Sequence, residues 1–69
     1  MEDHVYKKIE IVGTSEKSSD DAIKTALVRA SSSIKNLRWF EVIDTRGSIK
    51  DGEIEHWQVT ISLGFTMNG

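Results

Sequence analysis

Apolar and polar residues alternate along residues 4–12, which is the period-2 pattern of a half-buried strand. Residues 13–15 interrupt this pattern, and residues 16–19 are polar enough to form a loop. The first predicted element is therefore a strand with one mainly apolar face. That face would carry Val5, Lys7, Ile9 and Ile11, and the opposite face would carry Tyr6, Lys8 and Glu10.

A helix is predicted over residues 19–35. Ser18 and Asp21 resemble a capping box with aspartate in place of glutamate, and acidic residues suit the positive end of a helix dipole. Asn36 is a plausible left-handed residue at which the helix would stop. The apolar stripe is rich in alanine, which predicts a close approach to the surface it packs on. The stripe consists of Ala22, Ile23, Ala26, Leu27, Ala30 and Ile34.

Two more strands are predicted at residues 37–49 and 53–66. The Asp51-Gly52 pair between them is a strong hairpin signal. The resulting order, β-α-β-β, predicts an α+β fold in which a three-stranded antiparallel sheet curls around one helix. In the last strand one face is entirely apolar: Trp57, Val59, Ile61, Leu63 and Phe65.

The strand at residues 37–49 carries large apolar side chains on both faces. If Phe40 and Val42 meet the helix, then Leu37, Trp39 and Ile43 lie on the open face of the sheet. An exposed aromatic and aliphatic patch normally marks an interface or a ligand site. The pattern therefore predicts a second, functional surface opposite the helix.

Composition limits how such a chain can be stabilised. Its 69 residues fit one domain, residues 1–69, and domains of this size usually need a disulfide, a metal or a partner subunit. The absence of cysteine excludes a disulfide and a zinc site of the Cys/His type. We therefore expect this small domain to be stabilised by self-association. Mixed charges with a net charge of -2 argue against a dedicated nucleic-acid binder. No apolar run is long enough to span a membrane and no signal-peptide layout is visible, so we expect a cytoplasmic protein.

Catalytic chemistry is poorly supported by the residues present. The serines cluster in the loop and on the helix, where they serve as caps and polar-face residues. His4 and His56 are isolated, and Glu53 with Glu55 reads as a solvated pair beside a hairpin. The sequence therefore predicts binding, and we expect no enzymatic activity and no metal site.

Trp39 is the residue that points to a ligand. An indole on the open face can stack on a planar ring, and Gln58 could donate to and accept from the edge of that ring. Arg46 could lie over an aromatic plane or meet a phosphate. Two plainer interpretations stay open at this point: Trp39 could pack against another subunit, and Gln58 could be a surface amide.

Eight short motifs follow one another along almost the whole chain. They are residues 4–10 (HVYKKIE), 12–18 (VGTSEKS), 21–23 (DAI), 37–42 (LRWFEV), 46–47 (RG), 51–52 (DG), 56–59 (HWQV) and 64–65 (GF). Each motif is weak alone, and their order and spacing make the set specific. Together they resemble the dodecins, small flavin-binding proteins of bacteria and archaea.

This resemblance implies a hollow homododecamer that holds stacked flavin pairs, FMN or riboflavin, between tryptophans of neighbouring subunits. Trp39 matches the stacking position, Gln58 the glutamine that bonds the isoalloxazine edge, and Arg46 an arginine near the ligand. Arg38 adjoins the stacking residue and is carried over with them. The implied role is flavin storage and sequestration with rapid quenching of the excited flavin.

The resemblance also implies coenzyme A as a second ligand, because some bacterial members bind it through the first strand. Tyr6 and Lys7 are then the candidate contacts. Thr66 departs from the pattern, since many bacterial members have a basic residue there, which removes a phosphate contact or an ion pair between subunits. The alternative to flavin storage is a structural or protein-interaction module without flavin dependence, and an enzyme with a flavin cofactor is the third interpretation.

Overall fold

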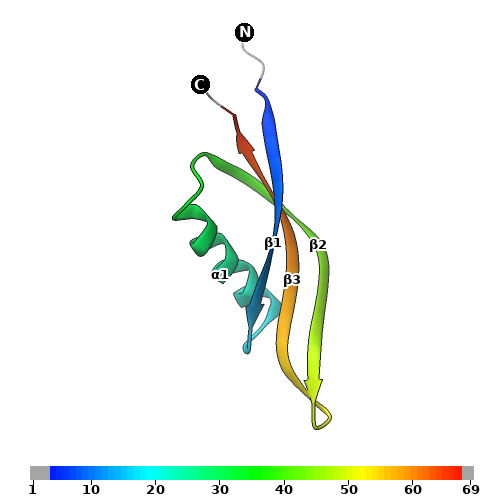
Figure 1. Ribbon diagram of the computed structural model, residues 1–69. Coiled ribbons are helices and arrows are strands. Elements are labelled where there is room, and N and C mark those ends of the chain that lie inside the picture. The colour runs from blue at the N-terminus through cyan, green and yellow to red at the C-terminus, as the bar shows by residue number, and fades with distance from the viewer. Residues whose placement is uncertain (1–3, 68–69) are drawn as a thin grey trace.

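The computed structural model describes residues 4–67 and has the predicted order of elements. The elements are β1 (Tyr6–Ser15), α1 (Ser19–Ser31), β2 (Leu37–Lys50) and β3 (Glu53–Thr66), with β3 in the centre of one antiparallel sheet in the order β1-β3-β2 (Figure 1). The β-α-β-β prediction is confirmed. Within residues 4–67, no helix is long and apolar enough to cross a membrane.

The helix begins where the sequence predicts and ends earlier. Ser18 is the N-cap and its Oγ accepts from the Asp21 amide at 3.0 Å, while the Asp21 carboxylate accepts from Ser15 Oγ at 2.7 Å and does not complete a capping box. The helix ends at Ser31, four residues before the predicted end. The reason is the serine run, in which Ser31 Oγ and Ser32 Oγ donate to the carbonyls of Val28 and Arg29.

The predicted hairpin turn and the left-handed conformation of Asn36 are confirmed, whereas the prediction that the helix stops at Asn36 is wrong. Asp51 and Gly52 have φ of 55° and 78°, as a type I′ turn requires, and this turn joins β2 to β3. Asn36 has φ of 67°, but it lies beyond the end of the helix and turns the chain directly into β2.

The core forms where the helix crosses the sheet. Gly13 on β1 lets the helix come close, because a Cβ there would overlap the Ala22 carbonyl oxygen and lie 2.9 Å from Ala26 Cβ. The alanine-rich stripe therefore packs as predicted. The fully buried apolar residues are Ala22, Ala26, Ala30, Val59, Ile61 and Leu63.

The helix packs mainly on β1 and β3 and leaves β2 uncovered. Phe40 and Val42 lie opposite Leu63 and Ile61 on the helix side of the sheet, yet they remain 45% and 44% exposed. In a single copy, Phe40 and Val42 therefore lie on the helix side of the sheet without being buried by the helix.

Leu37 also differs from the prediction. A bulge between Leu37 and Trp39 adds one residue to β2, so Leu37 pairs with Phe65 and packs against the core on the helix side. A second bulge lies at Ile43, which stays exposed. Of the side chains predicted for the open face, Trp39 therefore lies there and Leu37 does not.

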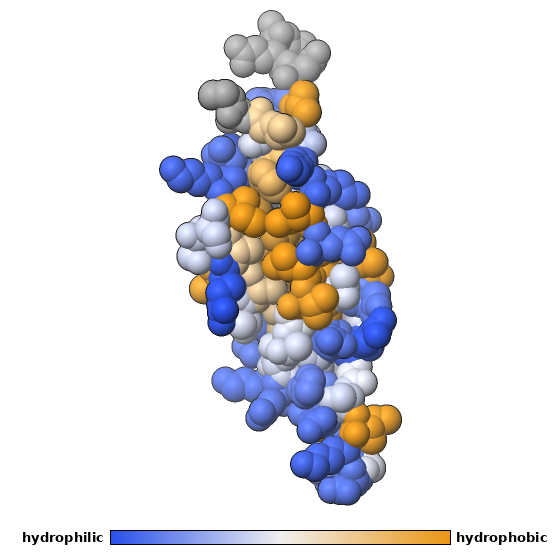
Figure 2. Space-filling view, in the orientation of Figure 1, coloured by the Kyte–Doolittle hydropathy of each residue, from blue (hydrophilic) through white to orange (hydrophobic). Residues whose placement is uncertain are grey.

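The described chain is elongated, measuring 56 × 20 × 13 Å. Its radius of gyration is 14.5 Å, against about 11 Å for a compact chain of this length. The β2–β3 hairpin extends beyond the helix (Figure 1), and apolar residues gather on the middle of the face shown in Figure 2. This shape leaves apolar surface on both sides of β2 that one copy cannot bury.

We expect the Gly13→Ala variant to lose about 1–3 kcal/mol of unfolding free energy, because its methyl group would press against the helix backbone. Gly47→Ala is the matched control, since the added Cβ would approach one carbonyl oxygen at 3.2 Å. The measurement is chemical denaturation at matched protein concentration. A smaller loss for Gly13→Ala than for Gly47→Ala would contradict the close helix contact.

Candidate functional site

Trp39 lies on the open face of the sheet, directly over Gly64 of β3. The two residues are paired in the register, and a Cβ on Gly64 would overlap the indole atoms Cδ2, Cε2 and Cζ2. Because Cδ2 and Cε2 form the bond shared by the two rings, Gly64 lies under the middle of the indole. The inner face of the ring is therefore closed, and the side chain is still 40% exposed on its outer side.

Two residues of β1 reach the same indole. Tyr6, opposite Thr66, places its ring centroid 6.5 Å from that of Trp39 at an angle of 60°. Lys8, opposite Gly64, places its Nζ over the Trp39 ring at 6.0 Å from the centroid. The indole thus lies on Gly64 of the central strand β3, and Tyr6 and Lys8 of β1 are its neighbours on this face.

Gln58 and Arg46 form a second group on the same face. They lie opposite each other on β3 and β2, which supports their predicted association. Gln58 is half-buried, whereas the Arg46 side chain is 65% exposed. Arg46 Nη2 donates to Asp44 Oδ2 at 2.9 Å, and this hydrogen bond, together with the carboxylate charge, raises the pKa of Arg46 above its usual value.

One copy of the chain does not bring Trp39 and Gln58 together. Gly64 and Gln58 are six residues apart on β3, which corresponds to about 20 Å along the strand. This separation is longer than a three-ring isoalloxazine. A ligand that touches both side chains must therefore take them from two different copies.

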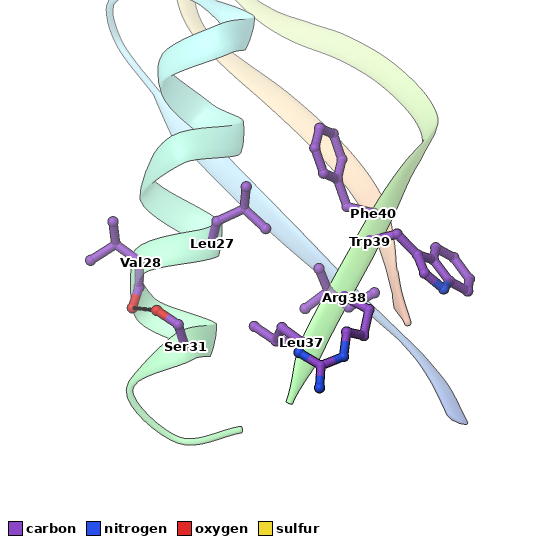
Figure 3. Close-up of a pocket in the computed structure, with 8 residues that line it drawn as sticks. Leu27, Val28, Ser31, Leu37, Arg38, Trp39 and Phe40 are labelled. Atoms are coloured by element: carbon purple, nitrogen blue, oxygen red, sulfur yellow. Dashed lines mark hydrogen bonds between the residues drawn. The ribbon is translucent and has the colours of Figure 1, made fainter. Parts of the chain in front are cut away.

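Arg38 does not point toward the indole. Figure 3 shows the Arg38 guanidinium beside Leu37 and the Trp39 ring directed away from the helix. Arg38 lies at the rim of an apolar hollow of about 340 Å³ between α1 and the start of β2. The hollow is lined by Leu27, Val28, Ser31, Leu37, Arg38, Trp39, Phe40 and Leu63.

Tyr6 and Lys7 point to opposite faces of β1, as neighbours on a strand do. Tyr6 approaches Trp39, whereas Lys7 lines a hollow of about 490 Å³ together with Lys35 and Asn36. They do not form one site in a single copy. Thr66, near the same end of the sheet, is 5% exposed, and within residues 4–67 its Oγ1 is buried without a hydrogen-bond partner.

Sequence reasoning missed Gly64 and Lys8 as site residues. A lone glycine inside an alternating strand is a recognised sign that another group approaches closely, and that signal was available for Gly64. No comparable signal existed for Lys8, because its position beside Trp39 depends on the register of two strand pairs across β3.

The arrangement can hold a planar ring on the outer face of the indole, with Tyr6 and Lys8 nearby. The surface available to a ligand is the Trp39 indole, which Gly64 covers on one face and which is exposed on the other. Across residues 4–67, no group of three or more His, Cys, Asp or Glu residues could hold a metal ion.

Comparison with known proteins gives consistent matches over the whole fold. The sequence model of the dodecin family matches residues 5–68. The dodecin of Thermus thermophilus is 44% identical over 63 residues, which is 91% of this chain and 91% of that protein. The structure of dodecin from Streptomyces coelicolor is 45% identical, with a TM-score of 0.94 over 100% of this chain and 99% of that one.

A more distant structural relative binds calcium. The calcium dodecin of Mycobacterium tuberculosis, an immunodominant antigen with a calcium-binding site, is 32% identical, with a TM-score of 0.80. The match covers 93% of this chain and 91% of that chain. The fold thus stays similar across relatives whose identity falls from 45% to 32%.

We expect Gly64→Ala to lower the unfolding free energy by about 1–3 kcal/mol, because the methyl group displaces the Trp39 indole. In a Trp39→Ala background the same substitution has no ring to displace and should cost under about 0.5 kcal/mol. Chemical denaturation of the four proteins at matched concentration measures the coupling. Equal costs in both backgrounds would show that Trp39 does not rest on Gly64.

Proposed function

This chain belongs to the dodecin family, and we propose that it binds FMN or riboflavin between copies of itself, stores the flavin and suppresses its photoreactivity. The observation that carries this proposal is the Trp39 indole, closed on its inner face by Gly64 and open on its outer face. A planar aromatic ligand gains most from such a surface, because stacking buries two apolar ring faces.

The ligand site is completed by a second copy in this proposal. The distance of about 20 Å along β3 between Gly64 and Gln58 prevents one copy from supplying both the stacking ring and the amide. The exposed apolar side chains Phe40 and Val42 and the elongated shape also favour self-association. We propose that the assembly is a homododecamer, as the family resemblance implies.

Gln58 and Arg46 of a neighbouring copy would then recognise the edge of the flavin. A side-chain amide offers one acceptor and two donors, which suits the alternating carbonyl and N–H groups of an isoalloxazine. Arg46 would have to exchange its contact with Asp44 for the ligand, and it would favour the phosphate of FMN. For Arg38 the direction of its guanidinium supports a place at the subunit interface better than a contact with the ring.

Storage and protection follow from the same contact. An electron-rich indole that touches an excited flavin offers a fast non-radiative return to the ground state, so the bound flavin neither emits nor reacts. The feature that stands out on this face is an exposed stacking surface, and we therefore propose binding without turnover. A cytoplasmic location stays a prediction.

Binding of coenzyme A stays a prediction, and only one of its two candidate residues, Lys7, lines a hollow that suits it. Lys7 and Lys35 give the hollow beside Phe65 and Thr66 a positive character that suits a phosphate. Tyr6 lies on the other face and could contribute only through another copy or another part of the ligand. We carry over no calcium site from the Mycobacterium tuberculosis relative.

Replacing Trp39 with alanine should weaken riboflavin binding by about fivefold or more, since stacking on an aromatic side chain contributes about 1–3 kcal/mol per ring. The measurement is quenching of riboflavin fluorescence during titration, with assembly size checked by native mass spectrometry. Trp57→Phe is the control, because Trp57 lies on the helix side of β3. Unchanged affinity in an intact Trp39→Ala assembly would favour the interaction module without flavin dependence.

Replacing Gln58 with leucine should weaken riboflavin and FMN about tenfold each, because the ring edge loses its hydrogen bonds in a desolvated site. Arg46→Met should instead weaken FMN more than riboflavin, because only FMN carries a phosphate. Isothermal titration with both ligands separates the two effects. An equal loss of FMN and riboflavin in Arg46→Met would exclude the phosphate contact.

A further inference from the structure

His56 lies on the same face of β3 as Gln58, on the side nearer the turn that joins β2 to β3. The two residues are neighbours at about 7 Å along the strand, and both are half-buried. Ser48 is the register partner of His56, as Arg46 is of Gln58. The row formed by Ser48 and His56 is thus the next one after the row that carries the proposed contacts with the ring edge.

Hydrogen bonds fix which ring nitrogen of His56 carries the proton. Ser48 Oγ lies 3.2 Å from Glu55 Oε1 and 3.3 Å from His56 Nδ1. A hydroxyl group has one proton, and because an ionised carboxylate can only accept, Ser48 donates that proton to Glu55. Nδ1 is then the donor to Ser48 Oγ. The neutral imidazole is therefore held in the Nδ1–H tautomer, which leaves Nε2 as a hydrogen-bond acceptor.

We propose that His56 Nε2 accepts a hydrogen bond from a hydroxyl group on the ribityl chain of the bound flavin. His56 is then a specificity-determining residue for a ligand that carries a polyol chain. The inference rests on the proposed function and adds recognition of the chain to recognition of the ring. A ring whose edge lies on Gln58 carries this chain beyond the ring, and an extended five-carbon chain spans a distance similar to the step of about 7 Å from Gln58 to His56.

The row on the other side of Gln58 suits the chain less well. It consists of Thr60 and Asp44, and the Asp44 carboxylate already accepts from Arg46 at 2.9 Å. A hydroxyl group there would compete with a charged donor. Over His56 it meets an acceptor whose orientation is fixed by the contact with Ser48, so binding costs little further side-chain entropy.

The test compares riboflavin with lumiflavin, which has the same ring and a methyl group in place of the ribityl chain. Titrations follow flavin fluorescence at about pH 8, above the usual titration range of imidazole, and native mass spectrometry checks the assembly. His56→Phe keeps a planar ring and removes both nitrogens, so it should weaken riboflavin about threefold to tenfold and change lumiflavin by less than about twofold. Equal changes for the two ligands, or no change for either, would overturn the role of His56.

Thr60→Val is the matched control, because Thr60 lies two residues from Gln58 in the opposite direction and the substitution also removes a hydrogen-bonding group. It should weaken riboflavin by less than about twofold. A loss of riboflavin affinity in Thr60→Val without one in His56→Phe would show that the chain runs the other way, and it would overturn the proposal.

Ser48 is a positioning residue in this proposal, because it acts only through the imidazole. Ser48→Ala should release His56 to the Nε2–H tautomer, which free histidine prefers in water, and should weaken riboflavin less than His56→Phe does. Nitrogen-15 NMR of the imidazole measures the tautomer without any ligand. An Nε2–H tautomer in the parent protein would overturn this inference and leave flavin storage intact. A parent protein that binds neither flavin would overturn the proposed function as well.

Discussion

The contact between the Trp39 indole and the backbone of Gly64 organises one whole face of the sheet. A bulge at the start of β2 changes the pleat so that Trp39 faces away from the helix, and a glycine on the central strand removes the Cβ that would otherwise hold the ring off the sheet. The large, rigid side chain therefore lies on the backbone with one face hidden. This geometry leaves an apolar surface of fixed orientation, which is what a planar ligand needs and what a free tryptophan on a strand lacks.

A second constraint on the structure is the apolar surface of β2, which one copy of the chain cannot bury. The helix needs Gly13 and its alanine stripe to pack closely on β1 and β3, and that placement draws it away from β2. Phe40, Val42 and Ile43 stay exposed on the two sides of the strand that carries Trp39. The same packing that gives the chain its small core thus leaves exposed the apolar surface that self-association would cover. The proposed ligand site lies on the same strand, so we expect it to form together with that interface when copies assemble.

Local signals predicted most of the fold. The I′ turn at Asp51-Gly52, the N-cap at Ser18 and the two faces of β3 depend on neighbouring residues, and each is present in the structure. The sequence-based predictions were wrong where an extra residue in a strand, or a contact between distant residues, determines where a side chain lies or where an element ends. Leu37 changes sides because of a bulge, which a strict alternation of two cannot show, and the helix ends early because its serines bond to their own backbone. The pairing of Trp39 with Lys8 requires the complete strand order, which the sequence alone leaves open.

Lys8 gives the exposed Trp39 indole a neighbour in the free protein. A cation near an exposed ring contributes about 0.5–1 kcal/mol, whereas stacking of an aromatic ligand contributes about 1–3 kcal/mol per ring. The ammonium can therefore lie over Trp39 in the free protein and still give way to the planar ligand that we propose. Because the Lys8 backbone is paired with Gly64, the side chain would remain close to the indole after it gives way.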